Sequence, residues 1–256
     1  MEQNRLSIRA LVVLAAELGA AHLFGVRDPF MVLDHEEIRA TYEACLEELE
    51  QVGAITRQFE GASIVRDDLR RQIEICAGCD LYLTIDEVIC GHTEPSVVFY
   101  RQGNDWVQLT KHDDMASLAD AADGAIETLA LARLLKACAA QNIPETQAGW
   151  SLTNDTLRHC LKNTAEGRAE LLKTGMPEDV TALLLAGLER QCGYCCVNTV
   201  HLQTRTLESL CLVYNSDMLL RLEPGETEQE DWIVCRSTPE QVLHTLRALL
   251  REEMPL

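Results

Sequence analysis

Two C-x-x-C pairs are the part of the sequence with the clearest potential for chemistry. Cys76 and Cys79 form the first pair, and Cys192 and Cys195 form the second. Two such pairs can supply the four thiolates of a tetrahedral zinc site, and one pair can form a redox-active dithiol. A metal-binding protein that uses these four cysteines is therefore one alternative for the function.

The residues around the pairs favour a structural role instead. A redox-active C-x-x-C begins a helix, where the helix dipole lowers the thiol pKa. Here a helical pattern precedes each pair, and Gly78 and Gly193 are typical of a helix C-terminal turn. The two pairs are also much farther apart in the sequence than the pairs of a compact zinc ribbon. We expect the cysteines to pack as small apolar residues, and we expect no cofactor.

The sequence contains no known catalytic motif. It has no G-x-S-x-G, no Walker-type glycine loop and no G-x-G-x-x-G, and its seven His form no H-x-x-x-H pair. The sequence therefore predicts that the protein is not an enzyme.

Composition restricts the possible partners. The 256 residues include 41 acidic and 22 basic side chains, which give a net charge of −19. Such a surface repels nucleic acid and anionic membranes. The apolar stretch near the N-terminus is interrupted by Glu17 and His22, so we expect no integral membrane segment. Eleven cysteines without a visible export signal indicate a cytoplasmic location.

The two halves of the chain repeat a similar order of patterns. Asp34 and Glu37 form a capping signal for a helix, and residues 152–175 have a corresponding helical pattern with a stripe at Leu157, Cys160 and Leu161. A second helix follows in each half, with Ile64, Val65, Leu69 and Ile73 in the first. It leads into the C-x-x-C pair and an alternating, strand-like run.

Further landmarks continue the repeat. Strand-like runs occupy 96–100 and 209–214, and Trp106 and Trp232 each follow an Asp at the start of a β-like segment. We predict a helix after each Trp segment, over 112–135 in the first half and 237–253 in the second.

These patterns predict an α+β fold built from a pseudo-twofold duplicated unit, with a central, largely antiparallel sheet and flanking helical bundles. A lead helix at about 4–22 and the first repeat occupy residues 1–141. A linker covers 142–150, and the second repeat covers 151–256 within one shared globular fold.

The layout resembles the EspG-type chaperones of type VII (ESX) secretion and their Firmicutes relatives. The resemblance is carried by the lead helix ending in LAAELGAAHLFGV, the helix pair EEIRATYEACLEELEQVGAI and SIVRDDLRRQIEICAGCDLYLTI, and the repetition of the whole. It implies a non-enzymatic cytosolic chaperone or adaptor. Such a protein holds a helical-hairpin secretion substrate for type VII export and uses a hairpin of the sheet and part of a helical bundle.

The resemblance also implies a partner-binding surface on two hairpins. The turns are expected at 102–104 and 215–217, and the expected partner-binding residues are Val98, Tyr100, Trp106, Tyr214 and Met218. The sequence does not identify the partner. An acidic immunity protein that blocks a basic toxin is a second alternative, which the net charge favours.

Overall fold

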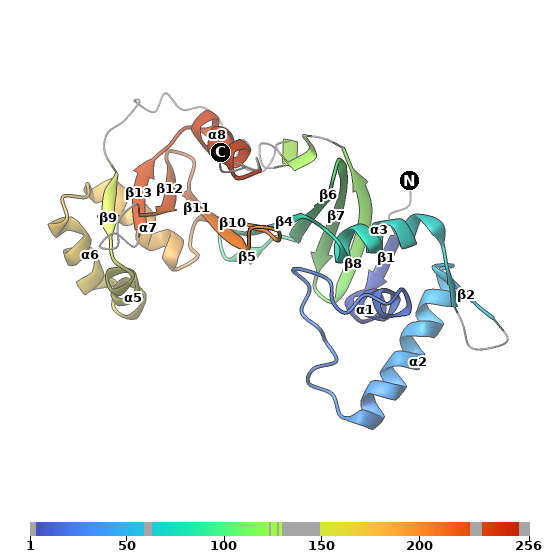
Figure 1. Cartoon of the computed structure of the whole chain (residues 1–256). Helices are drawn as coiled ribbons and strands as arrows, with labels where there is room; N and C mark the ends of the chain where they lie inside the picture. The colour runs from blue at the N-terminus through green and yellow to red at the C-terminus, as the bar shows by residue number, and fades with distance from the viewer. Residues whose placement is uncertain are drawn as a thin grey trace. The chain divides into compact units, whose positions relative to one another are not determined.

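The computed structural model describes residues 4–58, 63–122, 124–126, 128–129, 149–225 and 232–250 (Figure 1). The predicted linker, 142–150, lies outside the described residues except for its last two. The chain forms two compact units. Unit 1 comprises Met1–Thr84, Pro95–Asp123 and Val200–Thr206, and unit 2 comprises Ile85–Glu94, Gly124–Thr199 and Leu207–Leu256. Helices accompany an antiparallel sheet in both units, which confirms the α+β class.

Unit 1 is built on the strand order β1-β8-β7-β6-β4. Its elements are β1 (Asn4–Ser7), α1 (Ile8–Glu17), α2 (His35–Gln51), β2 (Ile55–Arg57), β3 (Ser63–Val65), α3 (Asp67–Ala77), β4 (Leu81–Ile89), β6 (Ser96–Gln102), β7 (Asp105–His112) and β8 (Met115–Ala121). The strand pairs β1–β8, β7–β8 and β6–β7 are all antiparallel. Strands β2 and β3 form a separate two-stranded sheet.

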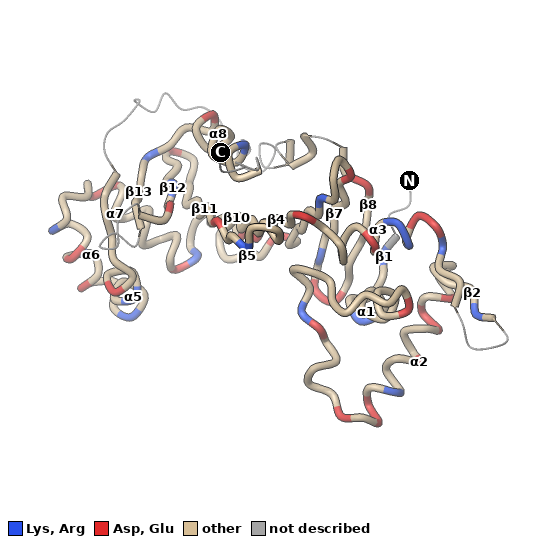
Figure 2. Tube along the Cα trace, viewed as in Figure 1, with Lys and Arg blue, Asp and Glu red and all other residues tan. Residues whose placement is uncertain are grey.

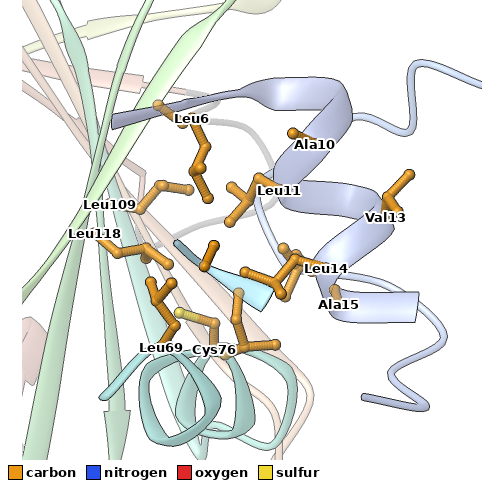
Figure 3. Packing of buried hydrophobic residues seen from close by; sticks show 14 of the residues in the cluster. Leu6, Ala10, Leu11, Val13, Leu14, Ala15, Leu69, Cys76, Leu109 and Leu118 are labelled. Atoms are coloured by element: carbon orange, nitrogen blue, oxygen red, sulfur yellow. The ribbon is translucent and has the colours of Figure 1, made fainter. Parts of the chain in front are cut away.

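Helix α1 supplies much of the core of unit 1. Its apolar residues pack with Leu69 and Cys76 of α3 and with Leu109 and Leu118 of the sheet (Figure 3). Leu14 has no exposed surface at all. Burial of a Leu side chain contributes about 2 kcal/mol, so this helix is a main source of stability for the unit.

The start of unit 1 differs from the predicted lead helix. Residues 4–7 form strand β1, in which Leu6 pairs with Ala116, and the helix begins only at Ile8. Ser7 ends the strand and caps the helix, because its hydroxyl accepts a hydrogen bond from the Ala10 N–H. The same Ser7 donates from its N–H and its hydroxyl to the carboxylate of Glu48 in α2. The capping box predicted at Asp34 and Glu37 is present in full.

Two predicted helical segments are strands. Ile64 and Val65 belong to β3, and α3 begins at Asp67. Residues 115–121, predicted to begin a helix, form β8. Their Ala, Met and Leu favour a helix locally, but buried residues alternate along the segment and it pairs with both β7 and β1. Tertiary pairing therefore overrides local propensity here.

Unit 2 has the strand order β10-β11-β12-β13-β9. Its elements are β9 (Trp150–Leu152), α5 (Asn154–Lys162), α6 (Thr164–Lys173), α7 (Glu178–Leu188), β10 (Gly193–His201), β11 (Thr206–Tyr214), β12 (Leu219–Pro224), β13 (Trp232–Arg236) and α8 (Pro239–Leu250). The short strand β5 (His92–Thr93) pairs with the end of β4. The helix predicted over 237–253 is α8, within the described residues.

The single helix expected over 152–175 is two helices. Asn163 ends α5 and also caps α6, with φ −148° and ψ 94°, which are extended rather than helical angles. Gly167 allows the two helices to approach closely, because a Cβ there would lie 2.6 Å from the Cα of Cys160. Cys160 is buried as predicted, whereas Leu161, predicted on the same stripe, is 61% exposed.

The two halves have the same topology, which supports the predicted duplication. In each, an edge strand leads into helices, and a long strand and three further strands follow. The edge strands are β1 and β9, the first helices are α1 and α5, and the long strands are β4 and β10. Helix α1 is therefore part of the first copy and does not precede it. The Trp landmarks were matched wrongly, because Trp106 lies in β7 and Trp232 lies in β13, which corresponds to β8.

Each unit includes a short segment from the other half of the chain. Residues Val200–Thr206 belong to unit 1, where the Leu202 N–H donates to the Asp80 carbonyl at 2.9 Å. Residues Ile85–Glu94 belong to unit 2, where Glu87 accepts a hydrogen bond from Tyr214. Folding of each unit therefore depends on both halves of the sequence.

Candidate partner-binding surfaces

The first predicted hairpin forms as expected, but most of its apolar residues are not at the surface. Strands β6 and β7 meet at the predicted turn, with Gln102 opposite Asp105. Val98 and Tyr100 have no exposed surface, and the Tyr100 hydroxyl donates to the Phe24 carbonyl at 2.5 Å. Burial raises the pKa of Tyr100 well above its usual value. The expectation that Val98 and Tyr100 are exposed is therefore wrong.

Val98 and Tyr100 are buried because both faces of β6 are covered. Val97 and Phe99 point the other way from Val98 and Tyr100 and are equally buried. The alternation argument assumed one face in contact with solvent, as in many antiparallel sheets. Trp106 is half-buried, and the guanidinium of Arg101, its cross-strand neighbour, lies 5.7 Å from the centre of its ring.

In the second hairpin too, a predicted partner-binding residue is buried. The turn after β11 is held by Asn215, whose side-chain oxygen accepts from the backbone N–H groups of Asp217 and Met218 at 2.8 Å. Tyr214 is buried and its hydroxyl donates to the buried carboxylate of Glu87, so its expected exposure is wrong too. Met218 is half-buried and packs against the core of unit 2. Met218 and Trp106 are the predicted partner-binding residues that retain accessible surface.

The C-x-x-C cysteines are packed into the two cores. Cys76 and Cys79 are buried in unit 1, and Gly78 between them caps the C-terminus of α3 as predicted. Burial raises the pKa of Cys79 to about 12 and raises the pKa of Cys76 well above its usual value, so both remain thiols at neutral pH. In unit 2, Cys195 is buried and the Cys192 thiol lies 3.9 Å from the Leu183 carbonyl.

Gly193 has another role than the one predicted. It is the first residue of β10, and a Cβ there would lie 2.1 Å from the ring of Tyr214. The glycine therefore makes room for an aromatic ring instead of ending a helix.

Two further observations concern metal ligands and membrane-spanning helices. Over the ranges given above, no group of three or more His, Cys, Asp or Glu side chains is arranged to hold a metal ion. Among the same residues, no helix has the length and apolar character needed to cross a bilayer.

Charge along α2 opposes nucleic-acid binding. The helix has six Glu and one Arg, and Figure 2 shows the acidic positions distributed along its length. A helix that reads DNA or contacts phosphates needs the opposite balance. The charge of α2 therefore gives no electrostatic support for contact with nucleic acid.

Unit 1 has an apolar groove that sequence reasoning missed. The groove has a volume of about 860 Å³ and lies between the start of α1, the loop 27–32 and α2. Met31 and Val32 at its edge are 78% and 77% exposed. On α2 it is lined by small side chains, among them Ala40 and Ala44. The run FMVL at 30–33 was the available signal, because four large apolar residues stand together just before a helix cap.

Each of the first two helices of unit 2 has an exposed leucine. Leu161 of α5 is 61% exposed and Leu172 of α6 is 39% exposed. Large exposed apolar side chains on a rigid support are typical of a protein-docking surface. We call the α5–α6 pair with these two leucines the helical elbow.

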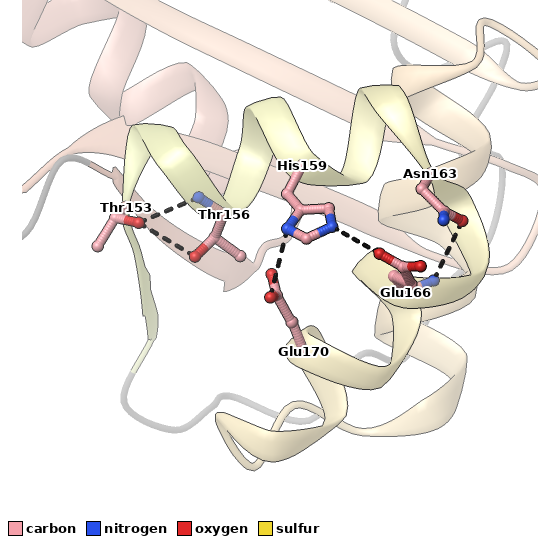
Figure 4. Close-up of polar contacts among 6 residues, drawn as sticks. All are labelled: Thr153, Thr156, His159, Asn163, Glu166 and Glu170. Atoms are coloured by element: carbon pink, nitrogen blue, oxygen red, sulfur yellow. Dashed lines mark hydrogen bonds and ion pairs between the residues drawn. The ribbon is translucent and has the colours of Figure 1, made fainter.

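Polar contacts fix the angle of the helical elbow (Figure 4). His159 lies between two carboxylates of α6, with Nε2 3.0 Å from Glu166 and Nδ1 3.4 Å from Glu170. Thr153 caps α5 by accepting from the Thr156 N–H at 3.1 Å, and Asn163 caps α6. The elbow therefore presents its leucines from a defined conformation.

Comparison with known proteins assigns the fold. No protein-family model and no curated protein sequence matches the chain. Its structure is similar to that of the Mycobacterium tuberculosis type VII secretion system chaperone EspG5, solved in complex with a PE25–PPE41 dimer. The chain has the EspG5 fold. The TM-score is 0.66 at 14% sequence identity, and the match covers 96% of this chain and 95% of EspG5. The resemblance seen in the sequence is thus confirmed for the fold.

Proposed function

We propose that this protein is a non-enzymatic secretion chaperone or adaptor that holds a helical-hairpin substrate for type VII export. The observation that carries the proposal is a shared fold over nearly the whole length of both chains, with a partner bound to EspG5. A chaperone of this kind needs exposed apolar side chains in a fixed arrangement, and it needs no catalytic group.

The helical elbow is the proposed contact surface. Leu161 and Leu172 are exposed although the surrounding helices are well capped, so their exposure does not result from a poorly formed element. An amphipathic partner helix would bury both leucines and remove them from water. Trp106 and Met218 remain candidates for further contacts, because both are partly accessible.

The first experiment is native mass spectrometry of the protein purified from its own source. We expect a complex of the 28.6 kDa chain with a small helical protein. A chain with one zinc ion and no partner would instead support the metal-binding alternative. A complex with a basic toxin, together with neutralisation of that toxin, would support the immunity alternative that the charge of −19 favours.

The second experiment maps the surface with matched variants. Leu161→Glu combined with Leu172→Glu is expected to weaken partner binding at least about tenfold, as for central contact residues of an interface. Met31→Glu combined with Val32→Glu is the control, because it changes two apolar residues in unit 1 that are even more exposed than the leucines. Unchanged affinity in the first variant and loss in the second would place the partner on the groove of unit 1 instead.

A further inference from the structure

Two cysteines outside the C-x-x-C motifs lie against each other in unit 2. Cys196 in β10 and Cys211 in β11 have their sulfur atoms 3.3 Å apart, and both are free thiols. Ser209 and Asn198, on the same two strands, are also joined, by a hydrogen bond of 2.7 Å between their side chains. The two thiols therefore face each other across neighbouring strands of one hairpin.

The setting of this pair differs from that of the C-x-x-C cysteines. Burial alternates along β10, so that Cys195 lies on the buried side while Tyr194 and Cys196 lie on the half-buried side. The Tyr194 hydroxyl donates to the Cys211 sulfur at 3.7 Å, and the Asn198 amide donates to the Cys196 sulfur at 3.5 Å. Each sulfur atom thus has a polar donor, and Cys196 is half-buried while Cys211 is buried.

The hydrogen bonds also distinguish the two thiols. The hydrogen bond between the two thiols lowers the pKa of Cys211 to about 7, with further help from Tyr194 and against the effect of burial. The pKa of Cys196 is raised, first by the same hydrogen bond and second by partial burial. Cys211 therefore has a thiolate population at neutral pH, while Cys196 keeps its proton.

We propose that Cys196 and Cys211 form a reversible disulfide when the protein meets a hydroperoxide. Geometry carries the proposal, since the two sulfur atoms lie 3.3 Å apart on neighbouring strands. The proposal does not depend on the chaperone function.

The reaction balances with the peroxide as the oxidant. The Cys211 thiolate attacks one oxygen of hydrogen peroxide, the O–O bond breaks, and the departing hydroxide takes up a proton to become water. Cys211 is then a sulfenic acid. The Cys196 sulfur next forms the S–S bond, the S–O bond breaks, and the hydroxyl leaves as water with the Cys196 proton. Two thiols have lost two electrons and two protons, and the peroxide has been reduced to two waters.

The test is peptide mapping of the full-length reduced protein after treatment with equimolar hydrogen peroxide. Trypsin places Cys211 in the peptide 206–221 and Cys196 in the peptide 191–205, together with Cys192 and Cys195. We expect the two peptides to be linked, with the loss of two hydrogen masses, and to separate again with dithiothreitol. A reaction confined to the exposed Cys90, without this link, would overturn the proposal.

Variants identify which of the three cysteines in the peptide 191–205 forms the link to Cys211. Cys196→Ser and Cys211→Ala are expected to abolish it, and Cys195→Ser is expected to retain it, because that side chain lies on the other face of β10. Retention of the link in the Cys196→Ser variant would contradict the assignment of the link to Cys196. Circular dichroism of each variant confirms that it is folded.

A further variant tests which sulfur atom attacks the peroxide first. Tyr194→Phe removes a hydrogen bond to Cys211 and is expected to slow formation of the link about fivefold, which corresponds to one ordinary hydrogen bond. An unchanged rate would contradict the assignment of Cys211 as the attacking sulfur.

Discussion

The first helix of unit 1 and the first helix of unit 2 hold the same position in the topology but have opposite environments. Helix α1 buries five of its ten residues, among them Leu14, whereas α5 buries only Cys160. Helix α1 also forms a core with the sheet, while α5 turns sharply into α6 and exposes Leu161. A duplicated topology therefore does not imply a duplicated role, because burial decides whether a helix stabilises the fold or offers a surface.

The largest expected effect is at Leu14. Leu14→Ala would leave a cavity in the core of unit 1 and lower the free energy of unfolding by about 3 kcal/mol. Urea unfolding measures the change. A loss below about 1 kcal/mol would mean that α1 is no more a core element than α5 and would break the comparison.

The next largest effect on stability is expected where α5 and α6 approach closely in the helical elbow. Gly167→Ala places a Cβ against the backbone of Cys160 and should destabilise unit 2 by about 2 kcal/mol. Ala165→Ser on the same helix is the control, because Ala165 is exposed and its replacement should cost less than about 0.5 kcal/mol. Equal stability of the two variants would show that the elbow is loosely packed.

Helix capping in unit 1 should give a smaller effect. Asp34→Ala removes the acceptor for two backbone N–H groups of α2 and should cost about 1 kcal/mol. Asp34→Asn keeps an oxygen acceptor at the same place and should retain most of the stability. Thermal unfolding of both variants distinguishes loss of the cap from loss of the charge.

The contact between α1 and α2 predicts a pH dependence. Burial, together with the hydrogen bond that Tyr42 donates to Glu17, raises the pKa of Tyr42 from 10.0 to about 12. The folded state therefore favours the neutral phenol, so this contribution is complete below pH 10 and is lost as the pH rises to about 12. Tyr42→Phe should remove that part of the alkaline loss. The effect is modest because the side chain is partly exposed.

The smallest effect on stability is expected at Leu161. Leu161→Ala should change the free energy of unfolding by less than about 0.5 kcal/mol, because the side chain is already in water. Its effect should appear instead in partner binding. A destabilisation as large as that of Leu14→Ala would mean that Leu161 is buried in solution, and the contrast between the two helices would disappear.

Local signals in the sequence predicted the parts of the fold that local forces decide. The Asp34–Glu37 capping box, the end of α3 at Gly78 and the turn at Asn215 each depend on residues within one turn of chain, and each is present. Strand β8 was missed because its residues favour a helix and only pairing with β7 and β1 makes it a strand.

The candidate site was less predictable than the fold. Alternation in β6 correctly indicates a strand, but it cannot show that both faces are covered, and so Val98 and Tyr100 were placed at the surface. The spacing of the C-x-x-C pairs indicated a possible metal or redox site, but these thiols are packed into the two units. The pair with a favourable arrangement, Cys196 and Cys211, is adjacent only because two strands lie side by side.

The sequence by itself determined the acidic charge, the duplicated order of elements and the ends of several helices, since composition and short-range hydrogen bonds decide these features. The tertiary structure alone decided which apolar side chains are exposed and which thiols meet. The physical reason is that burial and sulfur–sulfur contact depend on what packs against a residue, and the packing partners come from distant parts of the chain.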